Sequence, residues 1–221
     1  MRAPIIEVIC PKESATGFLR ASMSQNHQAS MDILKQNKIA WPQLIFLFGF
    51  FLTLPLYAAK VDSLDVPSTV MKKNLRAVVV LPESYQSAGK SKTSYPVLYL
   101  LHGGYGHYND WITKTPDKTL IHRLADQYNL IIVMPEGEVF SYYLDSPVIK
   151  DSQFETYLTK EVIEKIDNTY RTIRSPKGRV ITGLSMGGYG ALYLATRHPD
   201  LYCAAGSMSG ALNLDMNRWK L

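Results

Sequence analysis

The stretch Gly178-Arg179-Val180-Ile181-Thr182-Gly183-Leu184-Ser185-Met186-Gly187 decides the fold of this chain. Its first five residues have the character of a short buried strand, and residues 188–198 have the character of a helix. In the turn between them, Gly183 stands two residues before Ser185 and Gly187 two residues after it. These glycines leave room for the Ser185 hydroxyl to project from a strained backbone. Strand, sharp turn and helix in this order predict a nucleophile elbow, with Ser185 as the nucleophile.

A second motif lies upstream, where the apolar run 95–101 ends in the loop His102-Gly103-Gly104-Tyr105-Gly106. An apolar run without alternation is typical of a strand buried on both faces of a parallel sheet. Glycines at its carboxyl end allow backbone N–H groups to approach a ligand. We therefore expect the N–H groups of Gly104 and Met186 to form an oxyanion hole, whose two donors together lower the barrier by several kcal/mol.

Segments of strand and helix character alternate from residue 60 onward. The pattern predicts strands at 75–81, 95–101, 130–134, 178–182 and 202–208, helices at 119–128, 153–171 and 188–198, and a polar loop at 83–94. Strands separated by helices imply a parallel sheet with right-handed crossovers. The sequence therefore predicts an α/β fold, with a mostly parallel sheet flanked by helices in one domain over residues 60–221.

The first 59 residues differ in character from this domain. The uncharged apolar run 44–56 follows Lys35 and Lys38 and precedes two alanines, which is the order of a secretory signal peptide. We interpret residues 31–59 as this signal and residues 1–30 as a leader that reflects an over-extended start. An uncleaved membrane anchor is the alternative for 31–59. Either interpretation predicts an exported protein that meets a membrane only through this segment.

Composition excludes several classes of function. The formal net charge is +5, but the basic residues are scattered and form no stripe interleaved with aromatics, so no nucleic-acid partner is predicted. Histidines, cysteines and carboxylates show no metal-ligand spacing, and we predict neither a metal nor another cofactor. Of the two cysteines, Cys10 lies in the leader and Cys203 is expected to be buried in an apolar strand. The oligomeric state is left open.

Several segments together resemble the esterase D-like branch of the α/β-hydrolases, which includes S-formylglutathione hydrolases, feruloyl and acetylxylan esterases and mycolyltransferases. The resemblance extends over residues 75–212 and is carried by Leu100-Leu101-His102-Gly103-Gly104, Asp110-Trp111, Tyr170-Arg171-Thr172, Gly183-Leu184-Ser185-Met186-Gly187-Gly188-Tyr189-Gly190-Ala191, Arg197-His198-Pro199-Asp200 and Ser207-Met208-Ser209-Gly210-Ala211. It implies an α/β-hydrolase fold and an acyl-enzyme formed on Ser185.

The chain departs from this family after the elbow. The catalytic triad of the fold runs in the order serine, acid, histidine, but only Asp200, Asp215 and His198 follow Ser185. His198 and Asp200 come too early, at the end of the elbow helix. We therefore interpret residues 60–221 as a domain truncated before the acid and the histidine, which are expected beyond Leu221.

Other residues receive weaker assignments. Asp110 and Trp111 are expected either to position the glycine loop or to line the acyl pocket, and Tyr143 is expected at the pocket entrance. His102 precedes the serine and opens the oxyanion loop, which favours a structural role over that of a general base. His107 is expected at the surface.

The leading hypothesis is an exported serine carboxylesterase that acts on a small-molecule or polysaccharide-linked ester, such as an acetyl or feruloyl ester. Two alternatives remain. The first is an acyltransferase of the same fold, which passes the acyl group to a sugar. The second is a catalytically inactive remnant that acts at most as a binding module, because a serine without its base is a poor nucleophile.

Overall fold

The computed structural model describes residues 59–87 and 93–212. The leader at 1–30 and nearly all of the segment at 31–59 lie outside the described residues. Within the described ranges, no helix is long and apolar enough to cross a membrane.

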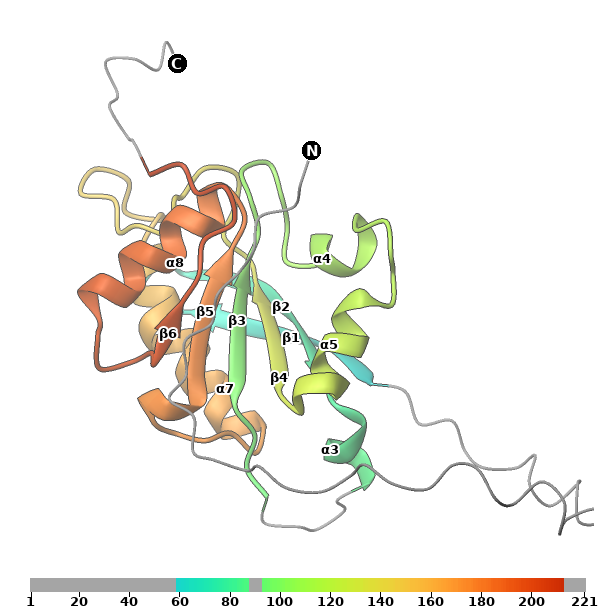
Figure 1. The fold of residues 1–221 in the computed structure, drawn as a ribbon. Coiled ribbons are helices and arrows are strands. Elements are labelled where there is room, and N and C mark those ends of the chain that lie inside the picture. The colour runs from blue at the N-terminus through green and yellow to red at the C-terminus, as the bar shows by residue number, and fades with distance from the viewer. Residues whose placement is uncertain (1–58, 88–92, 213–221) are drawn as a thin grey trace, which may run out of the picture. The chain divides into compact units, whose positions relative to one another are not determined.

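Six strands form one mixed sheet in the order β1-β2-β4-β3-β5-β6 (Figure 1). They are β1 (Lys60–Ser68), β2 (Lys73–Leu81), β3 (Val97–Leu101), β4 (Ile131–Pro135), β5 (Arg179–Gly183) and β6 (Ala204–Ala205). The neighbouring strands β4, β3, β5 and β6 are parallel to one another. The pairs β1–β2 and β2–β4 are antiparallel. The predicted α/β architecture with a mostly parallel sheet is therefore confirmed.

Helices lie on both sides of this sheet (Figure 1). They are α3 (Glu83–Ser87), α4 (Asp110–Thr113), α5 (Leu120–Tyr128), α6 (Phe154–Thr156), the π-helical η1 (Tyr157–Val162), α7 (Ile163–Thr169), the 3₁₀-helical η2 (Pro176–Gly178) and α8 (Met186–Arg197).

The two faces of the sheet carry separate apolar cores. Along β4, Ile131 and Val133 belong to the core that includes α7 and α8, whereas Ile132 and Met134 belong to the core that includes α5. This alternation follows from the two-residue period of a strand. It explains why the central strands are apolar at every position.

Several elements differ from the prediction, among them the short helix α4, which was not predicted. β1 was not predicted, because its sequence is largely polar and its strand conformation comes from pairing with β2. The polar loop at 83–94 begins with the short helix α3. The predicted helix at 153–171 is interrupted by the π-helical turns of η1, which widen the helix locally. The predicted strand at 202–208 is reduced to two residues, and Cys203 beside it is exposed rather than buried, so that prediction was wrong.

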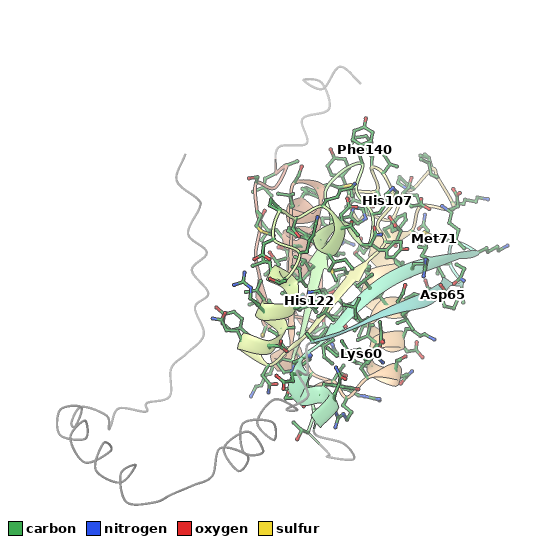
Figure 2. All side chains as sticks on the ribbon, turned by 90° about the vertical axis from the view of Figure 1, so that its right-hand side faces the viewer. Lys60, Asp65, Met71, His107, His122 and Phe140 are labelled. Carbon is green, nitrogen blue, oxygen red and sulfur yellow. The ribbon has the colours of Figure 1, made fainter. Side chains whose placement is uncertain are left out.

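The parallel strands bring the two sequence motifs together. β5 pairs with β3 so that Gly183 lies opposite Leu101, and the segments that follow the two strands leave the same edge of the sheet. The segment after β4 leaves this edge as well, because β4 is parallel to β3. Figure 2 shows Phe140 and His107, from two of these segments, at the end of the domain away from Lys60. The carboxyl edge of a parallel sheet is the usual place for a ligand site.

Candidate active site

Ser185 lies in the sharp turn between β5 and α8. Its backbone has φ 53° and ψ −112°, a combination that a residue with a side chain rarely adopts. The turn is held by hydrogen bonds from the Ser185 N–H to the Met208 carbonyl at 2.9 Å and from the Gly187 N–H to the Leu184 carbonyl at 2.8 Å. The serine is exposed to solvent. The geometry is that of an elbow which presents a hydroxyl at the edge of the sheet.

The glycines that flank the elbow are required by close packing. A Cβ atom on Gly187 would lie 2.6 Å from the carbonyl oxygens of both Leu101 and His102. A Cβ atom on Gly183 would lie 2.6 Å from the carbonyl oxygen of Gly187. Neither glycine has a positive φ, so the requirement for glycine is steric and does not concern the backbone conformation.

The glycine loop after β3 lies beside this elbow. A Cβ atom on Gly103 would be 3.6 Å from the Ser185 Cβ atom. The loop turns back on itself through a hydrogen bond from the Gly106 N–H to the Gly103 carbonyl at 3.0 Å. It is tied to the segment after β4 by the Tyr105 N–H, which donates to the Val139 carbonyl at 3.1 Å.

The N–H groups of Gly104 and Met186 are the two backbone donors assigned to the oxyanion hole. Among the described residues, no hydrogen-bond acceptor is found for the N–H of Gly104 or for that of Met186, which is the first residue of α8. An N–H in the first turn of a helix has no partner within that helix and attracts negative charge. This arrangement is compatible with the assignment of Gly104 and Met186, which stays a prediction.

A row of aromatic side chains lies next to the glycine loop. Phe140 contacts the loop directly, since a Cβ atom on Gly104 would lie 2.7 Å from its ring. The Phe140 ring also meets the Tyr105 ring edge to face, with 4.5 Å between the centroids, and stacks with Tyr142. Tyr142 in turn contacts Tyr189 of α8. Phe140 could not be predicted from the sequence, because a lone aromatic residue in a loop carries no pattern.

The three predicted pocket residues occupy different environments. The Asp110 carboxylate accepts a hydrogen bond from Lys114 at 2.9 Å, and a Cβ atom on Gly106 would lie 3.0 Å from it. The Trp111 indole N–H donates to the Leu101 carbonyl at 3.3 Å. Tyr143 is completely buried, and its hydroxyl donates to the His102 carbonyl at 3.0 Å. Tyr143 thus supports the glycine loop from inside the protein and does not face an open pocket entrance.

Burial and hydrogen bonding act in opposite directions on Glu136, which follows β4. Burial by itself raises the pKa of its carboxyl group. The contacts with the His102 ring and with the N–H groups of Glu138 and Tyr108 outweigh burial and lower the pKa to about 2. Glu136 is therefore a carboxylate at neutral pH, held in the interior by its partners.

Three of the described histidines, His102, His107 and His198, contact carboxylates. His198 Nε2 lies 2.8 Å from Glu155, which also accepts from Arg197 and Tyr193. His102 is buried against Glu136, and no described residue makes a hydrogen bond to the Ser185 hydroxyl. No group of three potential metal-binding side chains is found in the ranges 59–87 and 93–212.

Comparison with known proteins places this geometry among esterases. Residues 68–220 match the Esterase family model, whose description is "Putative esterase". The chain is 36% identical over 138 residues to Esterase MT1326 of Mycobacterium tuberculosis, covering 62% of this chain and 29% of that protein. It is 33% identical over 162 residues to the diacylglycerol acyltransferase/mycolyltransferase Ag85A of Mycobacterium gordonae, covering 69% and 43% respectively.

A solved structure of a ferulic acid esterase superposes with a TM-score of 0.61 at 32% sequence identity. The match covers 70% of this chain and 60% of that one. The chain therefore spans less than two thirds of the length of each of these three relatives.

Proposed function

The chain belongs to the esterase family, and from this premise we propose that it is a serine carboxylesterase that forms an acyl-enzyme on Ser185. The observation that carries the proposal is the strained and exposed Ser185, which lies beside the glycine loop. Two backbone donors of this region, the N–H groups of Gly104 and Met186, have no acceptor among the described residues. A nucleophile and an oxyanion hole on the same side of a reacting carbonyl are what acyl transfer requires.

In the proposed reaction, the Ser185 Oγ atom attacks the ester carbonyl carbon while its proton passes to a general base. The carbonyl oxygen becomes an oxyanion that accepts hydrogen bonds from the N–H groups of Gly104 and Met186. Collapse of this intermediate breaks the bond to the alcohol, which leaves after taking up the proton. Water then attacks the acyl-enzyme and releases the acid. We propose that the histidine base and its acid lie outside the described residues.

The substrate that we propose is a small-molecule or polysaccharide-linked ester, with acetyl and feruloyl esters as the first candidates. The similarity to a ferulic acid esterase supports this class. The aromatic row that includes Tyr105 and Phe140 would suit a substrate with an aromatic ring or a sugar face. A polysaccharide-linked ester would be met outside the cell, in agreement with the proposed export through residues 31–59.

A fluorophosphonate probe tests the nucleophile. We expect the probe to form one covalent adduct, located on Ser185 by peptide mass spectrometry, because the reagent reacts only with an activated serine. The Ser185→Ala variant is the matched control and should stay unlabelled. An adduct on another residue would overturn the assignment. Absence of any adduct on the folded protein would favour the inactive binding module.

Acyl transfer to an alcohol other than water is the second candidate function. The similarity to a mycolyltransferase favours it, because both reactions share the acyl-enzyme and differ only in the acceptor. We expect hydrolysis to dominate when a p-nitrophenyl ester is offered together with glucose or trehalose. Chromatography of the products measures the ratio of free acid to sugar ester. A sugar ester that exceeds the free acid at millimolar sugar would identify a transferase.

A further inference from the structure

The His102 ring links the glycine loop to the segment that follows β4. The side chain is only 2% exposed. Its Nδ1 atom lies 2.8 Å from the Gly103 carbonyl, which can only accept, so Nδ1 carries a proton. The Gly137 N–H donates to Nε2 on the other side of the ring at 2.8 Å. One buried ring thus connects the beginning of the glycine loop to a backbone 35 residues further along the chain.

Glu136 connects the other end of the same loop to the same segment. Its Oε2 atom accepts from the Tyr108 N–H at 3.3 Å and lies 3.5 Å from the His107 ring. Its Oε1 atom accepts from the N–H groups of Gly137 and Glu138 at 3.1 Å and 2.8 Å, and it lies 3.2 Å from His102 Nε2. Oε2 therefore accepts from the segment just after the glycine loop, and Oε1 accepts from the segment after β4.

We propose that His102 and Glu136 are positioning residues, which hold the Gly104 N–H at the place where the oxyanion forms. This inference rests on the proposed esterase function. The loop that carries Gly104 is held at its start through His102 and just beyond its end through Glu136. An oxyanion donor is effective only when it is fixed before the charge develops, because reorganisation during the reaction would cost part of its effect.

The variants His102→Gln and Glu136→Gln test this role, with Glu138→Gln as the matched control. A glutamine at 136 has one oxygen, so in either orientation one of the two segments loses its acceptor. The Glu138 carboxylate instead binds Lys73 at 2.9 Å and makes no bond to the glycine loop. Both test variants should fold, but if His102→Gln does not, Glu136→Gln alone carries the test.

In the full-length protein, we expect kcat for a p-nitrophenyl ester to fall by roughly 10- to 100-fold in both test variants, with KM changed less than about threefold. A misplaced donor weakens the bond to the oxyanion, which exists only in the transition state, and leaves ground-state binding intact. Rates are divided by the concentration of serine titrated with the fluorophosphonate, so partial unfolding does not imitate the effect. Glu138→Gln should keep kcat within about twofold.

Hydrogen exchange supplies a readout that needs no catalysis. Exchange of the N–H groups of Tyr105, Gly106 and Tyr108 should become at least about tenfold faster in Glu136→Gln and stay unchanged in Glu138→Gln. An inactive Ser185→Ala variant would support the esterase function. If Glu136→Gln then changes neither the exchange rates nor kcat, the positioning role is overturned. Turnover retained by Ser185→Ala would instead overturn the proposed function, and the exchange rates would still test whether Glu136 holds the glycine loop.

Discussion

Replacing Ser185 with glycine should abolish ester turnover and at the same time raise the stability of the protein. The loss of the nucleophile should lower kcat by about 10⁵-fold or more, leaving only what the oxyanion hole and substrate binding provide. The gain in stability has a separate cause. The backbone at Ser185 has φ 53° and ψ −112°, a conformation that costs a residue with a Cβ atom about 1–3 kcal/mol and costs glycine little.

The net stabilisation should be about 1 kcal/mol, because glycine also gains conformational entropy in the unfolded chain. Thermal unfolding should therefore show a rise in Tm of about 2–4 °C. Ser185→Ala is the matched control, since it removes the hydroxyl but keeps the Cβ atom and so keeps the strain. It should be equally inactive without the rise in Tm. Equal Tm values for the two variants would show that the turn is not strained, and turnover in either would refute the role of Ser185.

Replacing Gly187 with alanine should destabilise the protein by about 3 kcal/mol or more. The added Cβ atom would lie 2.6 Å from the carbonyl oxygens of Leu101 and His102, well inside van der Waals contact. Both oxygens belong to the backbone at the end of a central strand, which cannot move without disturbing the sheet and the glycine loop. Relief of the clash should therefore separate the elbow from the loop and reduce activity as well.

Gly206→Ala provides the comparison for this prediction. Its Cβ atom would meet the Thr182 side chain, with 2.9 Å to the hydroxyl oxygen, and a side chain can turn away. Urea unfolding should thus give a destabilisation below about 1 kcal/mol for Gly206→Ala. Similar values for the two variants would contradict the argument that the rigid backbone around Gly187 excludes a side chain.

Much of the architecture could be predicted because its signals are local. The strands β3, β4 and β5 were located within two residues. β3 and β4 are buried on both faces and form apolar runs, and β5 precedes the recognisable elbow motif. The helix α8 was expected at 188–198 and begins two residues earlier, because the elbow feeds directly into it. β1 could not be predicted from its own residues, since it becomes a strand only by pairing with β2.

Some residues of the candidate site could likewise be predicted from the sequence, and others could not. Ser185, Gly104 and Met186 could be proposed because each belongs to a motif whose members are adjacent in the sequence. Glu136 carried no such signal, because a single acidic residue after a strand is common. The environment of Tyr143 was likewise hidden, since nothing in a loop sequence tells whether a tyrosine faces solvent or the core.

The sequence by itself determined the parallel core, the elbow at Ser185 and the glycine loop after β3, because backbone sterics and hydrophobic periodicity act over a few neighbouring residues. Only the tertiary structure decided that His102 and Glu136 meet, that Phe140 covers Gly104, and that Gly187 has no room for a Cβ atom. These contacts join segments that are distant in the sequence, and they arise when parallel strands bring their carboxyl ends to one edge of the sheet.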